Sequence, residues 1–141
     1  MGKLLLPLHF ISLLAGILNG PGVGFFVGLI NPFLNFLILG MPPFPLFVFM
    51  SIELCTYGLV SGLLNKKNIF FDLIVSMLVG RCIYMIFYYF LGYMFAINLS
   101  PVSSILLSYV MGIPGIIIQL ILIPLLIKKI PHLKSMKYTG N

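Results

Sequence analysis

Two charged side chains, Glu53 and Arg81, lie deep within long apolar stretches of the sequence, and tyrosines follow both of them. Tyr57 is one helical turn after Glu53, and Tyr84 and Tyr88 are one and two turns after Arg81, so each set shares a helix face. A guanidinium beside phenol rings is suited to bind a small organic ligand that carries a carboxylate or another polar head group. A purely structural ion pair that joins two helices is the alternative, and the residue types alone leave both open.

The composition indicates the solvent that surrounds these residues. Of the 141 residues, 61% are hydrophobic and only 7% are charged, which is too little polar surface for a protein surrounded by water. The formal net charge of +6 is concentrated at the ends of apolar stretches. The clustered lysines are Lys66, Lys67, Lys128, Lys129, Lys134 and Lys137. This distribution follows the positive-inside rule and leaves no broad basic surface, so we predict an all-α integral membrane protein that binds no nucleic acid.

Five apolar stretches are long enough, or nearly so, for the ~20 residues that a helix needs to cross the hydrocarbon core. They are residues 4–20, 22–39, 44–64, 70–96 and 102–127. The links between them are short, so we expect residues 1–141 to form a single membrane domain, a compact bundle of five transmembrane helices. The lysine count places the 65–69 link and the 128–141 tail on the cytoplasmic side of the cell membrane. It also places Lys3 outside, which a further helix before Met1, absent from this chain, would explain.

The positions of the two buried charges predict that they lie level with each other. Glu53 is about 15 residues before the link at Asn68 and Arg81 about 13 residues after it, which gives roughly 22 Å and 20 Å of helical rise. Two antiparallel neighbouring helices would therefore hold both charges near mid-membrane. Because each charge alone costs about 2.5–3.5 kcal/mol there, we expect the side chains to face each other or a polar cavity.

Two further polar side chains, Asn35 and Gln119, lie inside apolar stretches. Asn35 follows Pro32, which removes a backbone donor from its helix, and it either caps a helix contact or lines a polar pocket that opens outward. Gln119 follows a distorted turn that Pro114 and its flanking glycines predict, and it either joins two helices or contacts a ligand.

Glycines recur every fourth residue in the first two stretches and again in the third. They are Gly16, Gly20, Gly24, Gly28, Gly58 and Gly62. Small residues at this spacing let helix backbones approach closely, either within one bundle or at a docking face for another membrane subunit.

No combination of residues in the sequence predicts a metal ion, a cofactor or a catalytic group. Cys55 and Cys82 have no CxxC spacing, and His9 and His132 are far apart in the chain. We therefore predict a protein that is not an enzyme and that needs no cofactor.

Taken in order, short motifs along the chain resemble those of one family. They are Leu6-Pro7-Leu8-His9, Leu13-Leu14-Ala15-Gly16 with Gly20-Pro21, Asn31-Pro32 with Gly40-Met41-Pro42-Pro43, Met50 with Glu53-Leu54 and Tyr57-Gly58, Gly80-Arg81 with Tyr84, and Gly112-Ile113-Pro114-Gly115 with Gln119 and Pro124. Over residues 6–129 this pattern resembles the substrate-binding S component of energy-coupling-factor (ECF) transporters, which import vitamins into prokaryotes.

The resemblance implies a bundle, normally of six helices, that captures a vitamin or precursor from outside and hydrolyses nothing itself. It would deliver the ligand through a transmembrane T component and two ATPase subunits, as part of an ECF-type ABC transporter complex. The ligand would lie in the outward half of the bundle, beneath loops equivalent to residues 3–9 and 40–45. The family usually starts with another helix, and nothing precedes Met1 here.

On this basis we predict a substrate site around Arg81, which would bind an anionic or carbonyl group, with Glu53 as its partner or as a cation acceptor. The full predicted set is Glu53, Arg81, Tyr84, Tyr88, Tyr57, Asn35, His9 and Gln119. A small intramembrane enzyme that uses Glu53 as an acid or base is one alternative, disfavoured because we identify no second carboxylate and no nucleophile beside a base. A scaffolding subunit that binds no small molecule is another.

Overall fold

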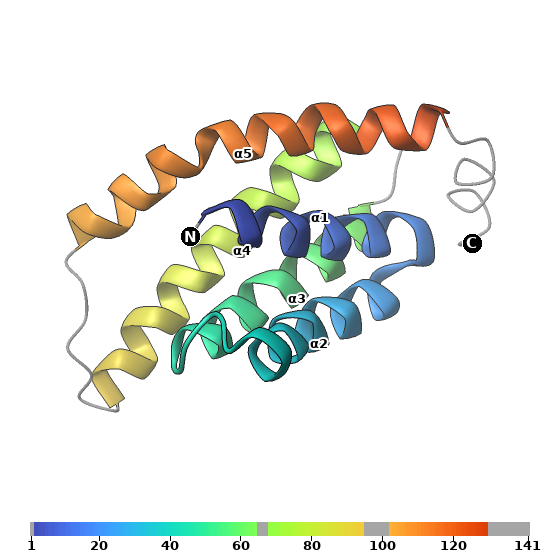
Figure 1. Cartoon of the computed structure of the whole chain (residues 1–141). Coiled ribbons are helices and arrows are strands. Elements are labelled where there is room, and N and C mark those ends of the chain that lie inside the picture. The colour runs from blue at the N-terminus through green and yellow to red at the C-terminus, as the bar shows by residue number, and fades with distance from the viewer. Residues whose placement is uncertain (1, 65–67, 95–101, 130–141) are drawn as a thin grey trace.

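The computed structural model describes residues 2–64, 68–94 and 102–129, with side chains described from residue 7 onward except at 102–106, 108–109 and 111. All regular structure in these residues is α-helical (Figure 1). The helices are α1 (Gly2–Asn19), α2 (Pro21–Leu39), α3 (Leu46–Leu64), α4 (Ile69–Met94) and α5 (Val102–Lys129). The link that holds Lys66 and Lys67 and the tail beyond Lys129 lie outside the described residues.

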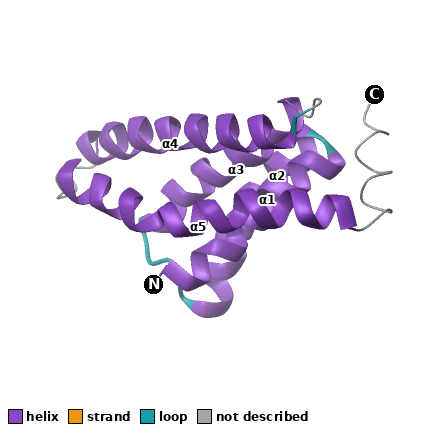
Figure 2. Cartoon of the chain, turned by 90° about the horizontal axis from the view of Figure 1, so that it is seen from above, coloured by secondary structure: helices purple, strands orange, loops and turns teal. Residues whose placement is uncertain are grey.

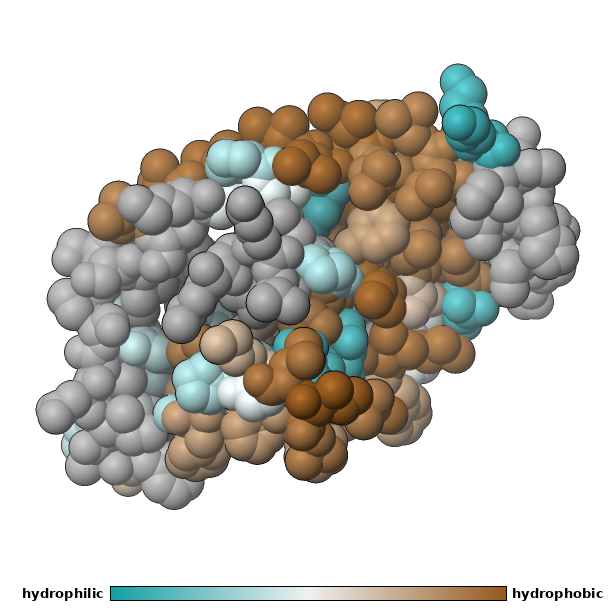
Figure 3. All heavy atoms as spheres, in the orientation of Figure 1, coloured by the Kyte–Doolittle hydropathy of each residue, from teal (hydrophilic) through white to brown (hydrophobic). Residues whose placement is uncertain are grey.

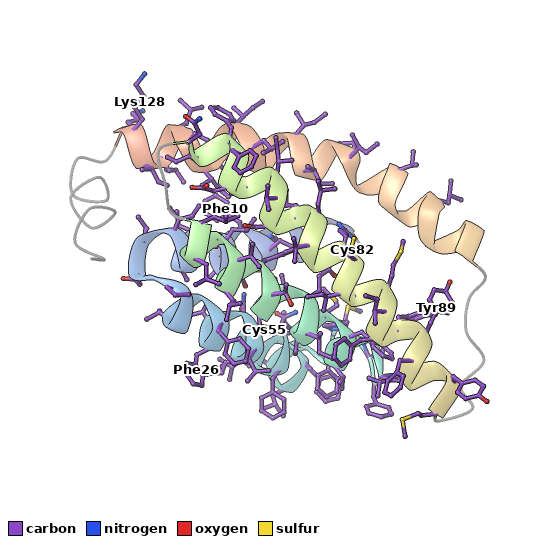
Figure 4. All side chains as sticks on the ribbon, turned by 180° about the vertical axis from the view of Figure 1, so that it is seen from behind. Phe10, Phe26, Cys55, Cys82, Tyr89 and Lys128 are labelled. Atoms are coloured by element: carbon purple, nitrogen blue, oxygen red, sulfur yellow. The ribbon has the colours of Figure 1, made fainter. Side chains whose placement is uncertain are left out.

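The described helices have the length and composition of membrane spans. Four segments are long and apolar enough to cross a bilayer, namely Pro21–Leu39, Leu46–Leu64, Ile69–Met94 and Gly112–Lys129, and a shorter apolar helix covers Pro7–Asn19. Large apolar side chains point outward from the bundle. Hydrophobic residues, coloured brown, cover much of the face shown in Figure 3. Phe26, for example, is 60% exposed and projects away from α2 (Figure 4). The prediction of an all-α membrane bundle is confirmed.

The regularly spaced glycines bring α1, α2 and α3 into backbone contact. A Cβ atom added at Gly58 would lie 2.0 Å from the Gly24 carbonyl oxygen, and one at Gly28 would lie 2.2 Å from the Leu54 oxygen. A Cβ atom at Gly16 would lie 2.1 Å from the Gly58 oxygen. These glycines therefore pack against other helices of the same bundle, which is the first of the two interpretations of their spacing.

The turn between α1 and α2 depends on a different glycine. Gly20 has φ +90°, a conformation that residues with a side chain rarely adopt, and Pro21 begins α2 immediately after it. The turn places α2 beside α1, and α1 in turn lies between α2 and α5 (Figure 1). Seen from above, α5 overlaps α1 (Figure 2).

The long helix α5 crosses α1 and α4 (Figure 1). It presents one inward stripe with one residue per turn: Gly115, Gln119, Ile123 and Ile127 are buried. The helix continues without interruption through Pro114 and Pro124, so the distorted turn predicted around Pro114 does not break it.

Candidate ligand-binding site

The two charges that the sequence placed at equal depth face each other across α3 and α4. Arg81 Nε lies 3.3 Å from Glu53 Oε1, and the phenol of Tyr57 donates a 2.5 Å hydrogen bond to the same carboxylate oxygen. The Glu53 side chain is 4% exposed, whereas 29% of the Arg81 side chain is exposed. The predicted register of the two helices is therefore correct, and the carboxylate is the enclosed member of the pair.

Gly80, next to Arg81, provides the space for the Tyr57 ring. A Cβ atom at Gly80 would lie 2.3 Å from both Cδ1 and Cε1 of Tyr57. Tyr57 is 2% exposed, so its ring is enclosed by its neighbours and a shift would disturb their packing. The Gly80-Arg81 pair on α4 is therefore matched to the Glu53 and Tyr57 pair on α3.

The first helix contributes His9 to the same cluster. The centroids of the His9 and Tyr57 rings are 5.5 Å apart, with 47° between the ring planes. The neighbouring Leu8 carbonyl accepts a 3.2 Å hydrogen bond from Asn31 Nδ2, which ties this part of α1 to α2. His9 thus packs against the tyrosine that donates to the Glu53 carboxylate.

Aromatic rings form a wall beyond the ion pair, toward the end of α4. Tyr84 and Tyr88 stack with centroids 5.8 Å apart and 16° between their planes, and Phe49 meets Tyr88 edge-on at 5.2 Å. Tyr89 packs against Tyr88 at 5.5 Å, and among the described residues its buried hydroxyl has no hydrogen-bond partner. Figure 4 shows Tyr89 projecting from α4 on the side of α5.

Sequence analysis predicted Tyr84 and Tyr88 but missed Phe49 and Tyr89. A phenylalanine in an apolar stretch has the same sequence signal whether it faces lipid or a site. Phe49 could have been found from its position one turn before Glu53, on the same helix face. Nothing in the sequence distinguishes Tyr89 from a lipid-facing tyrosine.

Helix α5 also approaches the guanidinium of Arg81. A Cβ atom at Gly112 would lie 3.9 Å from Arg81 Nη2, so Arg81 lies at the junction of α3, α4 and α5. Gln119 is buried on the inward stripe of α5, about 10 Å of helical rise away from Gly112. Its neighbours on α5, Leu120 and Ile123, pack in the core cluster that includes Tyr57.

Asn35 is tied to the loop that follows α2. Its Nδ2 donates a 2.8 Å hydrogen bond to the Met41 carbonyl, so it holds the loop between α2 and α3. The loop begins at Gly40, whose left-handed conformation (φ 67°) ends α2 while its N–H donates to the Phe36 carbonyl.

A second buried carboxylate, Asp72, was overlooked in the sequence because it lies near the start of an apolar stretch. It is 2% exposed and occupies the first turn of α4, where the helix dipole favours a negative charge. Its backbone N–H donates to Asn68, and its carbonyl accepts a 2.5 Å hydrogen bond from Ser76. Asp72 is about 13 Å of helical rise from Arg81, so it is not paired with Glu53 for acid–base chemistry.

A hollow of about 380 Å³ lies between α2 and α3. Its lining is apolar apart from Ser51. In the part of the chain with described side chains, no three metal-ligating residues gather, and Cys55 and Cys82 are free thiols on different helices (Figure 4).

Comparison with known proteins identifies the class to which this bundle belongs. Residues 2–127 match the family described as the substrate-specific component of ECF transporters. The match covers most of the chain, so this protein belongs to that family, as the motifs predicted. No curated protein and no solved structure matches the chain.

Proposed function

We propose that this chain binds a vitamin or cofactor precursor at the junction of α3, α4 and α5, with Arg81 as the main polar contact. The observation that carries the proposal is a buried ion pair in which the guanidinium retains 29% of its exposure beside an aromatic wall. Membership of the substrate-specific components supports it, because such a protein must recognise a small molecule.

We assign different roles to the two charges. Glu53 Oε1 already accepts from both Tyr57 and Arg81 and is almost fully enclosed, so we assign it the role of holding the guanidinium in place. Arg81 would donate to a carboxylate or carbonyl group of the ligand, where a charge-assisted hydrogen bond is worth about 1.5–3 kcal/mol. Tyr57 and Gly80 would act through Glu53 and not by contact with the ligand.

The aromatic wall would supply the apolar part of recognition. Stacked Tyr84 and Tyr88, with Phe49 edge-on, offer flat faces against which a ring system can pack. The buried Tyr89 hydroxyl would provide a further hydrogen bond. His9, Asn35 and Gln119 remain predicted contacts, of which His9 packs against Tyr57, the residue that donates to Glu53.

The direction of transport follows from the lysine distribution. With the 65–69 link and the C-terminal tail in the cytoplasm, the tyrosines after Arg81 lie on the outer side of the ion pair. The ligand would therefore enter from outside and would pass inward through a T component and two ATPase subunits. In this arrangement the chain itself carries out no chemical reaction.

Binding measurements on two neighbouring variants test the proposal. The ligand is first released from the purified protein and identified by mass spectrometry, and its affinity is then measured by isothermal titration. We expect Arg81→Ala to weaken binding about 10-fold to 100-fold, because it removes a charge-assisted hydrogen bond. Cys82→Ala, on the adjacent exposed position of α4, should bind as the native chain does. Equal affinity in both variants would remove Arg81 from the site.

A scaffolding subunit is the competing function, and the enclosure of Glu53 is the observation that favours it. If the ion pair only joins α3 to α4, exchanging its members in the double variant Glu53→Arg, Arg81→Glu should preserve assembly and transport. Under our proposal the exchanged chain loses the ligand, because the cation is moved to the enclosed position.

A further inference from the structure

A groove between α2 and α3 takes no part in the proposed ligand site. It measures about 380 Å³ and opens on the outer surface of the two helices. The residues that line it are Leu29, Ile30, Phe33, Phe47, Val48, Ser51 and Ile52.

The groove lies on the opposite face of α3 from the ion pair. At 100° per residue, the lining residue Ser51 points about 160° away from both Phe49 and Glu53 around α3. An occupant of the groove would therefore not contact Arg81 or the tyrosines, and this inference stands independently of the proposed function.

The chemistry of the lining excludes a polar occupant. Ser51 is the one polar residue of the lining, and its hydroxyl donates a 2.9 Å hydrogen bond to the Phe47 carbonyl within α3. A polar ligand would thus lose its hydration without gaining partners. Both flanking helices have the length and hydropathy of membrane spans, so hydrocarbon is what surrounds the groove.

The sizes of the residues that line the groove favour an acyl chain over another helix as its occupant. Helices associate in membranes through small residues that let backbones approach, and the buried small residues of α2, Gly24 and Gly28, are already packed against α3. The groove is instead bounded by bulky side chains such as Leu29 and Phe33, which would hold a second helix at a distance.

Aromatic rings close the groove toward the loop that joins α2 to α3. Phe47 stacks on Phe36 at 4.5 Å with 13° between the planes, and it contacts Phe33 at 6.2 Å and Phe44 at 6.1 Å. We propose that this groove binds one acyl chain of a membrane lipid from the leaflet on the side of this loop. A flexible chain can follow an irregular apolar hollow that a rigid helix cannot fill.

Native mass spectrometry of the full chain tests the proposal. The protein is purified from nanodiscs that contain phosphatidylglycerol with palmitoyl and oleoyl chains. We expect the native chain to retain one phospholipid and the groove-filling variant Ser51→Phe to lose it. Leu78→Phe, at a 61% exposed position of α4, is the matched control and should retain the phospholipid. Equal retention by Ser51→Phe and the native chain would overturn the proposal, as would a co-purifying protein seated in the groove.

A second measurement does not depend on a variant that fills the groove. The chain contains no tryptophan, so single reporters can be placed at Ile30 in the groove and at Leu78 outside it. With a small fraction of chain-brominated phosphatidylglycerol in the membrane, Ile30→Trp should be quenched more strongly than Leu78→Trp. Equal quenching would show that the groove holds lipid no better than the rest of the surface and would refute the inference.

Discussion

Adding one methyl group at Gly80 should disturb the ion pair without touching either charged residue. The new Cβ atom would lie 2.3 Å from two carbons of the Tyr57 ring, well inside contact distance. Since Tyr57 is 2% exposed, the ring must shift or α3 and α4 must separate. A shift of the ring lengthens the 2.5 Å hydrogen bond from Tyr57 to Glu53, and separation of the helices lengthens the 3.3 Å contact between Glu53 and Arg81.

The expected cost of Gly80→Ala follows from two effects and one offset. Overpacking in a filled interior costs about 1–3 kcal/mol, and loss of a hydrogen bond to a charged group costs about 1.5–3 kcal/mol. Alanine regains about 1 kcal/mol of helix propensity over glycine. We therefore expect Gly80→Ala to lower the free energy of unfolding by about 1.5–5 kcal/mol, and also to weaken ligand binding because Arg81 loses its fixed partner.

Thermal unfolding in nanodiscs, with and without the ligand, measures both effects. Gly22→Ala is the control for stability, because a Cβ atom there has no neighbour within 4 Å. Gly112→Ala is the control for the site, because its Cβ atom would lie at an ordinary 3.9 Å from Arg81 Nη2. If Gly80→Ala unfolds at the same temperature as Gly22→Ala, the claim that the Tyr57 ring needs the space left by Gly80 is wrong.

Two further variants test other buried polar groups. Tyr57→Phe removes only the hydroxyl that donates to Glu53, so it should lower the free energy of unfolding by about 1.5–3 kcal/mol. His9→Phe keeps a ring against Tyr57 and should lower the free energy of unfolding by less. An unfolding temperature equal to that of the native chain would show that Arg81 alone satisfies the carboxylate. For Asp72, we expect the leucine variant to unfold at a clearly lower temperature than the asparagine variant, because asparagine keeps hydrogen-bonding atoms in a buried position. Equal unfolding temperatures would show that the polar atoms of Asp72 do not contribute.

The fold class and the register of α3 against α4 could be predicted because each depends on one strong constraint. Apolar stretches of membrane-spanning length allow only helices, since backbone groups must be satisfied within the segment. A short link then fixes two antiparallel helices, and counting turns from Asn68 placed Glu53 level with Arg81, as the 3.3 Å separation confirms.

Other parts of the site could not be predicted because they depend on packing between helices. Tyr89 and Phe49 are defined as site residues by their neighbours, and the groove is formed jointly by side chains of α2 and α3. Asn35 was open to two interpretations, and the conformation of the α2–α3 loop decided its partner. Asp72 was a different kind of omission, because its sequence position was visible and only its burial was not.

An experimental structure of the full chain with its retained small molecule tests the central claim most directly. The claim predicts a ligand oxygen about 2.7–2.9 Å from a guanidinium nitrogen of Arg81, with a ring of the ligand packed against Tyr84, Tyr88 or Phe49. A ligand bound elsewhere in the bundle, with Arg81 still turned only toward Glu53, would contradict it.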